Sequence, residues 1–156
     1  RQFSNPDNIK CHATTTAEEI LKQLPPYRSV SAIVLGAGTG GTLMGLHRTL
    51  SRRFPDLKAI QVCPEEPNHL HGIQGINDGK DFLLNSEIVD EVLEIKTEDA
   101  ILRAQQLSRE SGLLVGISSG ANVLASERWI EKNNKLHGAI VLTVLCDRGE
   151  RYLSCY

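Results

Sequence analysis

The sequence of 156 residues lacks the features that mark several large classes of protein. It has no excess of positive charge, because 17 Lys and Arg residues are set against 19 Asp and Glu residues, for a net charge of −2. A nucleic acid needs basic residues to neutralise its phosphates, so we expect no nucleic-acid partner. No apolar run approaches the roughly 20 residues that a membrane span requires, and no secretory signal opens the chain. We therefore expect no membrane partner.

The spacing of the four cysteines is not that of a disulfide framework or a zinc site. None of the four stands in a CxxC pair or in a short-range framework, at positions Cys11, Cys63, Cys146 and Cys155. Disulfide scaffolds and zinc sites use such spacings, so free thiols in a reducing compartment are the simpler interpretation. We expect a cytoplasmic protein without a bound metal. The chain begins at Arg1 rather than at a methionine, from which we expect that a segment has been removed upstream.

Short apolar runs alternate with helical patterns along the whole chain. Strands are predicted over residues 31–35, 58–63, 92–95 and 139–145, the last as a central strand because it is the most apolar. Helices are predicted from a capping box at 15–18 to the prolines at 25–26, then over about 40–53, 97–112 and 118–133. This order predicts an α/β fold, with a parallel twisted sheet and helices on both faces. Ligands bind such sheets at the carboxyl edge.

The glycine-rich turn Gly36–Thr42 is the most informative segment, because it ends a predicted strand and opens a helix. Its N–H groups, together with the hydroxyls of Thr39 and Thr42, predict an anion site. The glycine spacing matches the dinucleotide fingerprint, but that fingerprint needs an acidic residue about 20 positions further on. The first acid after the second strand is Glu65, which stands too far along. A compact phosphate fits better, and a tight turn without a ligand is the structural alternative.

Five segments, in order, resemble the cysteine synthase (O-acetylserine sulfhydrylase) family, whose members are pyridoxal-phosphate enzymes related to cystathionine β-synthase. They are Gln2–Pro6 with His12 and Thr14–Glu19, then Gly38–Thr42, His71–Ile76, Gly116–Ala121 and Gly149–Ser154. The resemblance is to the C-terminal half of these enzymes. It implies that residues 1–156 form the cofactor-binding domain, an incomplete large domain of a fold-type II pyridoxal-phosphate enzyme.

The resemblance also implies a role for each matched position. The phosphate of pyridoxal 5'-phosphate would be held by Gly38, Thr39, Gly40, Gly41 and Thr42. Ser118 would bond the pyridine nitrogen, and a neutral hydroxyl there suits β-elimination followed by addition of a nucleophile. The structural alternative is that the two serines cap the helix that follows them, and both can hold if Ser119 caps while Ser118 faces the ring. The substrate side of the cofactor would be formed by Gly75, Ile76 and Asn77, the last standing where many members have glycine.

Asp147 follows the last predicted strand. We expect it either to approach the edge of the cofactor or to cap a backbone group or pair with Arg148 or Arg151. No catalytic residue is assigned within this chain, because the family's Schiff-base lysine lies in an N-terminal segment and no lysine here has a matching context.

The resemblance implies a cysteine synthase-like transferase of cysteine biosynthesis that performs β-replacement on an activated serine. The small-molecule amino-acid substrate would meet this chain's phosphate loop and pyridine contact, while the lysine comes from a missing or separate polypeptide with the N-terminal half. The chain alone would then be inactive, and the complete enzyme would be a homodimer. One alternative is a non-catalytic module that binds pyridoxal phosphate or phosphate, and a second is an NAD-binding fragment.

Overall fold

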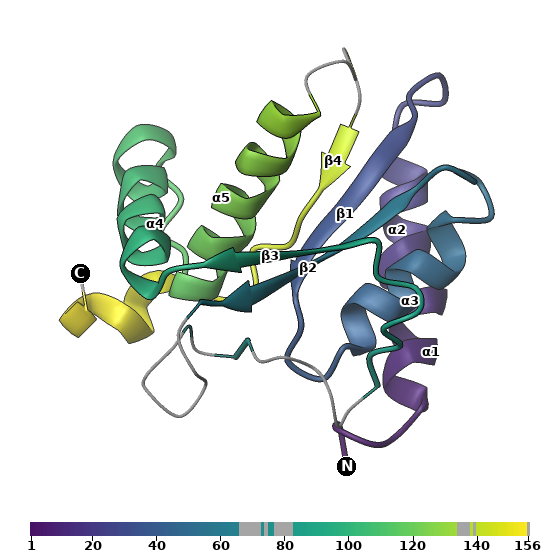
Figure 1. The fold of residues 1–156 in the computed structure, drawn as a ribbon, viewed down its shortest axis with the longest axis horizontal. Coiled ribbons are helices and arrows are strands. Elements are labelled where there is room, and N and C mark those ends of the chain that lie inside the picture. The colour runs from purple at the N-terminus through teal and green to yellow at the C-terminus, as the bar shows by residue number, and fades with distance from the viewer. Residues whose placement is uncertain (66–72, 74, 77–82, 134–137, 139, 156) are drawn as a thin grey trace.

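The computed structural model describes residues 1–65, 73, 75–76, 83–133, 138 and 140–155 (Figure 1). Its helices are α1 (Asp7–Thr14), α2 (Thr16–Gln23), α3 (Gly41–Leu50), α4 (Thr97–Ser111), α5 (Ile117–Lys132) and the 3₁₀ helix η1 (Gly149–Cys155). Its strands are β1 (Val30–Gly36), β2 (Lys58–Pro64), β3 (Glu91–Ile95) and β4 (Ile140–Leu142).

The strands form one sheet in the order β3-β2-β1-β4, and every neighbouring pair is parallel. The chain moves outward from β1 through β2 to β3, then returns to place β4 on the other side of β1. The direction of strand addition therefore reverses at β1. In parallel sheets the crevice at such a reversal, beyond the carboxyl ends of the strands, is where ligands bind.

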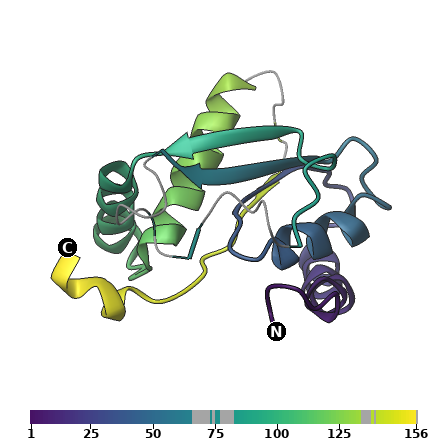
Figure 2. The same ribbon diagram turned by 60° about the horizontal axis from the view of Figure 1, so that its bottom comes forward.

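Helices cover both faces of the sheet, as the alternation of strands and helices predicts (Figures 1 and 2). Ala32 and Val34 of β1 pack with α4 and α5 on one face. Ile33 and Leu35 point the other way and pack with α2 and α3. All four side chains are buried, so β1 is the central strand between two apolar layers. The predicted α/β fold with a parallel sheet is confirmed.

Each layer contains a close helix crossing that only a glycine allows. A Cβ on Gly45 of α3 would lie 2.6 Å from the His12 Cβ and 2.7 Å from the Ile9 carbonyl oxygen of α1. A Cβ on Gly120 of α5 would collide with the Ala100 carbonyl of α4 and lie 2.9 Å from the Ala104 nitrogen. Both α3 and α5 begin at the carboxyl edge, so these crossings fix the two helix starts that border the crevice.

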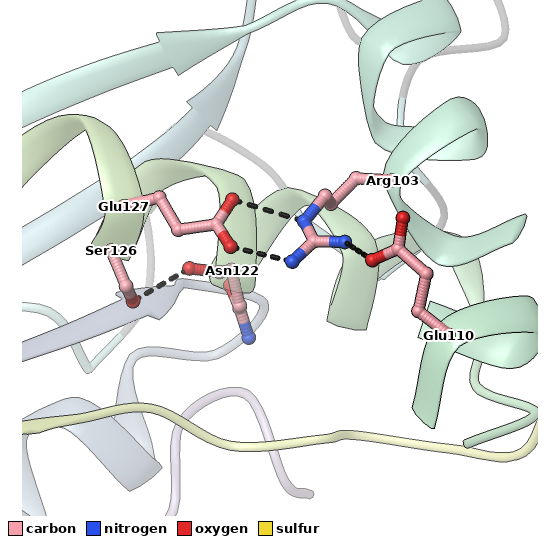
Figure 3. A network of polar contacts seen from close by, with 5 residues as sticks. All are labelled: Arg103, Glu110, Asn122, Ser126 and Glu127. Carbon is pink, nitrogen blue, oxygen red and sulfur yellow. Dashed lines mark hydrogen bonds and ion pairs between the residues drawn. The ribbon is translucent and has the colours of Figure 1, made fainter. Parts of the chain in front are cut away.

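The crossing of α4 and α5 is also tied by charge (Figure 3). Arg103 donates from Nε and from a terminal guanidinium nitrogen to the two carboxylate oxygens of Glu127, at 3.0 and 2.6 Å. Its other terminal nitrogen lies 3.6 Å from Glu110, which is in the last turn of α4. Arg103 is only 17% exposed, whereas Glu127 is 41% exposed, so the pair lies at the rim of the interface.

Two sequence predictions about the elements are wrong. β4 is a short strand at an edge of the described sheet rather than a long central one. It ends at Leu142 because Thr143 hydrogen-bonds to β1 through its side chain: its hydroxyl donates to the Val34 carbonyl at 2.8 Å. The capping box at Thr15 is absent as well, since the Thr15 hydroxyl donates back to the Cys11 carbonyl at 2.8 Å.

Helix α1 was not predicted at all. Its first turn is held by Asn5, whose side-chain oxygen accepts the Asp7 N–H at 2.9 Å. An asparagine followed by proline is a local start signal for a helix, but the helix has only 8 residues. Such a short segment has too weak a periodicity to be recognised from the sequence.

Candidate functional site

Three segments meet at the carboxyl edge of the sheet, beside β1 and β4. The glycine-rich turn runs from β1 into α3, the Gly116 region runs into α5, and residues 143–148 follow β4. All three start from the carboxyl edge of the sheet or lead into a helix that starts there. The structure thus brings together the predicted phosphate turn, Ser118 and Asp147, which are up to 109 positions apart in the sequence.

The turn presents hydrogen-bond donors without acceptors. Among the described residues, none accepts a hydrogen bond from the backbone N–H groups of Gly38, Thr39, Gly40 or Thr42. Gly40 is in the left-handed region at φ 81°, and a Cβ there would lie 2.6 Å from the Leu84 nitrogen. The Leu83 N–H donates to the Thr39 carbonyl at 2.9 Å. Contacts with Leu83 and Leu84 therefore hold the turn in place, while its own N–H donors stay available for an anion.

Two hydrogen bonds to its oxygen leave the Thr39 hydroxyl able only to donate. Its oxygen receives the Asn8 side-chain amide at 3.1 Å and the Gly41 N–H at 3.2 Å. A hydroxyl has two acceptor positions and one proton. With both acceptor positions used, Thr39 can only donate, which is the role that a phosphate oxygen requires. The donor set at the turn fits the phosphate group of pyridoxal phosphate.

Asn122 connects the turn to the segment after β4, and its role was missed in the sequence. It is fully buried in α5. Its side-chain oxygen accepts the Gly36 N–H at 2.8 Å, and its side-chain nitrogen donates to the Val144 carbonyl at 2.9 Å. A single amide thus satisfies one backbone group on each side of the crevice. The sequence marked Asn122 only by its position directly after the Gly116–Ala121 segment.

The two serines at the start of α5 do not cap the helix. The cap position is Gly116, whose carbonyl accepts the N–H groups of Ser119 and Gly120 at 3.1 and 3.2 Å. Ser119 is fully buried, and its hydroxyl accepts the Cys146 N–H at 2.9 Å. Ser118 is buried in the first helical turn. Its predicted contact with the pyridine nitrogen stays a prediction.

Asp147 is tied to a tyrosine rather than to an arginine. The Tyr152 hydroxyl donates to one of its carboxylate oxygens at 2.6 Å, and Arg148 lies 3.6 Å from Glu150 instead. The prediction of an arginine pair is therefore wrong for the described residues. The other carboxylate oxygen of Asp147 is buried and has no partner there. A Cβ on Gly116 would collide with that carboxylate, so glycine is required beside it.

Cys146 precedes this aspartate and does not behave as a nucleophile. The residue is exposed overall, but its thiol lies 3.5 Å from the side-chain nitrogen of Asn122. Desolvation raises the pKa of the thiol, and the charge of Asp147 raises it further. A cysteine nucleophile needs a lowered pKa, and burial shifts the pKa of this thiol in the opposite direction.

The predicted substrate side lies next to the phosphate turn. A Cβ on Gly38 would be 2.8 Å from the Gly75 carbonyl oxygen, and Ile76 occupies the space beside Gly36. Ile76 is buried, whereas the position of a Cβ on Gly75 has no neighbour within 4 Å. Gly75 has φ 79°, which favours glycine. Asn77, the third predicted residue, lies outside the described residues.

Other kinds of site are not found in the part of the chain that the structure describes. It contains no group of three or more His, Cys, Asp or Glu residues that could hold a metal ion. None of its helices is long and apolar enough to span a membrane.

Comparison with known proteins gives a consistent result. The family model described as "Pyridoxal-phosphate dependent enzyme" matches residues 1–147. The chain is 37% identical to cysteine synthase of Staphylococcus aureus (strain Mu50), over 99% of this chain and 51% of that protein. The chain thus spans about half the length of the curated relatives it matches.

Solved structures agree with the sequence comparison. Cysteine synthase from Entamoeba histolytica superposes with a TM-score of 0.86 at 38% identity, over 98% of this chain and 46% of that one. The O-acetylserine-dependent cystathionine beta-synthase from Helicobacter pylori superposes with a TM-score of 0.81 at 34% identity, over 98% of this chain and 51% of that one. The similarity covers the sheet, both helical layers and the turn.

Proposed function

Because the chain belongs to the pyridoxal-phosphate-dependent enzyme family, we propose that it supplies the cofactor-binding half of a cysteine synthase-like enzyme. The reaction would break the Cβ–O bond of an activated serine, release acetate or phosphate, and form a Cβ–S bond with sulfide or a bond with another nucleophile. The observation that carries this proposal is the donor set at Gly38–Thr42, where four N–H groups have no acceptor among the described residues and a donor-only hydroxyl suits a phosphate.

The residues of this chain would divide the work between them. Gly38–Thr42 would bind the phosphate, and the Ser118 hydroxyl would hydrogen-bond the pyridine nitrogen. Bound pyridoxal phosphate supplies an electron sink for the substrate's α-carbon. A neutral serine at the ring nitrogen makes that sink weaker than a carboxylate would, which favours β-elimination over transamination. Buried Ile76 would exclude water beside the turn, and Gly75 would leave room for the substrate.

The lysine that holds the cofactor covalently is proposed to come from a polypeptide corresponding to the other half of the relatives, since this chain spans about half of their length. The same half would bind the substrate carboxylate. On this proposal the chain is inactive unless complemented, the complete enzyme is a cytoplasmic homodimer, and Asp147 lies near the cofactor edge.

The test is to identify every polypeptide in the purified protein and to find which lysine carries the cofactor. The protein is saturated with pyridoxal phosphate, reduced with borohydride, denatured and measured by intact-mass and peptide mass spectrometry. We expect an adduct on a lysine of a second segment, and cysteine formation when O-acetylserine and sulfide are added. A Thr39→Val, Thr42→Val double variant is the matched control and should lose cofactor. Failure of the wild type to bind pyridoxal phosphate would contradict the proposal.

The adduct analysis and a fluorescence titration with NAD separate the alternatives. Reversible binding of pyridoxal phosphate with no lysine adduct would favour a non-catalytic binding module. Quenching of Trp129 fluorescence by NAD would favour a dinucleotide-binding fragment, which needs an acidic side chain at the end of β2. Glu65 follows β2, but its carboxylate lies 3.9 Å from the Lys96 ammonium at the end of β3, which argues against that role.

A further inference from the structure

We propose that Asn8 and His12 of α1 are positioning residues for the anion at the phosphate turn. They would hold the hydroxyls of Thr39 and Thr42 so that both protons point to the ligand. The inference rests on the proposed function, which puts the cofactor phosphate at this turn. It gives a role to the Gln2–Glu19 segment, for which the family resemblance implied none.

Asn8 acts on Thr39 by filling one of the two acceptor positions of its hydroxyl oxygen. The Asn8 amide nitrogen donates one hydrogen to the Gln2 carbonyl at 2.9 Å and the other to the Thr39 hydroxyl oxygen at 3.1 Å. The Gly41 N–H takes the second acceptor position of that oxygen at 3.2 Å. The described residues offer no acceptor for the Thr39 proton. Removing the Asn8 amide would reopen an acceptor position and let the hydroxyl rotate away.

His12 acts on Thr42 through its tautomer. Its Nε2 lies 3.2 Å from the Thr42 hydroxyl, and its Nδ1 lies 3.1 Å from the Thr16 hydroxyl. A neutral imidazole donates from one nitrogen only. If Nε2 carries the proton, it donates to Thr42, and Thr42 gives its own proton to the ligand. In the opposite tautomer the Thr42 hydroxyl would donate its proton to His12, and that proton would not be available to the ligand. A bound phosphate therefore selects the Nε2–H form, with Thr16 donating to Nδ1.

Helix α1 is packed well enough to fix these two side chains. It crosses α3 at Gly45, where the His12 Cβ takes the place that a side chain would occupy. The Asn8 side-chain oxygen fills the corresponding space at Gly41. Further along the crossing, the Thr49 hydroxyl donates to the Ala13 carbonyl at 2.8 Å. Hydroxyls that are oriented before the ligand arrives cost less ordering entropy on binding.

The test compares affinity for inorganic phosphate and for pyridoxal phosphate by calorimetry on the purified protein. Asn8→Leu and His12→Phe keep the side-chain volume but remove the donors. We expect each to weaken both affinities about tenfold, as for a hydrogen bond to a charged group. His12→Gln, whose amide can reach Thr42, should recover most of the loss. Affinity for pyridoxal, which lacks the phosphate, should not change.

Thr49→Val is the matched control, because it removes a hydrogen bond between the same two helices away from the turn. It should lower the melting temperature and leave both affinities unchanged. Heteronuclear NMR of the wild type adds a readout that needs no variant: with phosphate bound, His12 should carry its proton on Nε2.

Folded Asn8→Leu and His12→Phe variants that bind phosphate as tightly as the wild type would overturn the inference, as would an Nδ1–H tautomer in the bound state. If the wild type binds neither phosphate nor pyridoxal phosphate, the proposed function fails with it. Binding by the wild type with no effect of the variants overturns only the positioning role.

Discussion

The two helical layers use the same packing device for different ends. In each, a glycine lets two helices cross closely, Gly45 between α1 and α3 and Gly120 between α4 and α5. The polar contacts differ. Those of α4 and α5 are ion pairs at the rim, of which Arg103 with Glu127 is bidentate. Those that α1 makes with the turn and with α3 are neutral hydrogen bonds, and two of them reach the Thr39 and Thr42 hydroxyls at the carboxyl edge.

The difference shows how to interpret a polar contact between helices. An exposed ion pair gains little, because water solvates both partners well when they are apart. A neutral side chain that fills the acceptor positions of a hydroxyl instead decides where the remaining proton goes. We infer that the α4–α5 contacts tune stability, whereas the α1–α3 contacts prepare a ligand site.

The largest expected effect comes from removing the Asn122 amide, which connects the end of β1 to the segment after β4. Asn122→Leu removes the partner of the Gly36 N–H and of the Val144 carbonyl, two groups in part-buried hydrogen bonds. Each such group costs about 1–3 kcal/mol, so we expect the free energy of unfolding to fall by roughly 2–5 kcal/mol in urea denaturation. Ser126→Ala is the control: its hydroxyl only adds a bond to the Asn122 carbonyl, and its loss should cost about 1 kcal/mol or less. If Asn122→Leu lowered the free energy of unfolding by less than about 1 kcal/mol, its two backbone hydrogen bonds would not be important for stability.

Adding one methyl group to each crossing sharpens the comparison. Gly45→Ala and Gly120→Ala both overpack a helix interface, which costs about 1–3 kcal/mol, partly offset by the better helix propensity of alanine. We expect similar losses of stability. Only Gly45→Ala should also weaken phosphate binding, because its methyl group displaces His12. Equal phosphate affinities in the two variants, measured by calorimetry, would contradict the division between the layers.

A double-mutant cycle tests the charged contacts directly. Arg103→Met and Glu127→Gln, singly and together, should give a coupling energy of about 0.5–1 kcal/mol that shrinks in high salt. Glu127 is 41% exposed, which keeps the coupling small. Phosphate affinity should be the same in all four proteins. A change in affinity would mean that the α4–α5 layer also acts on the turn.

The smallest effect is expected at Asp90, which belongs to neither layer. Partial burial acts to raise the pKa of its carboxyl, but hydrogen bonds from Lys58 and from the Ala59 N–H outweigh it, and the pKa is lowered. A carboxyl with a lowered folded pKa stabilises the fold above its unfolded pKa of about 3.9, and this contribution is lost as pH falls through the folded pKa. Asp90→Asn should therefore lose less stability than the wild type between neutral pH and the acid range, by roughly 0.5 kcal/mol. Identical pH profiles in thermal melts would refute this.

Much of the fold could be predicted because it is local. Apolar runs located β1, β2 and β3, and Gly112, at φ 67°, ends α4 where a glycine stop was expected. The sequence could not show whether β4 is an edge strand or a central strand, because its apolar run is the same whether it pairs with one neighbouring strand or with two. The position of a strand in a sheet depends on contacts between distant segments, such as Thr143 with Val34.

The site divides in the same way. The glycine-rich turn and Ser118 could be proposed from the sequence because they stand in contiguous motifs, and their contacts with the cofactor stay predictions. Asn8, His12 and Asn122 act on residues 31, 30 and 86 positions away, and their partners are fixed only when the helices pack. A sequence pattern marks such residues at best as part of a family motif, without saying which hydroxyl or amide they hold.

The central claim is that Gly38–Thr42 binds the phosphate of pyridoxal phosphate. The most direct measurement is an amide NMR titration of the isotope-labelled protein with pyridoxal phosphate, with the Thr39→Val, Thr42→Val double variant as control. The account predicts that the N–H signals of Gly38, Thr39, Gly40 and Thr42 shift most in the wild type and that these shifts are lost in the variant. Saturable shifts confined to another part of the chain, or no shifts at the turn with cofactor bound, would contradict it.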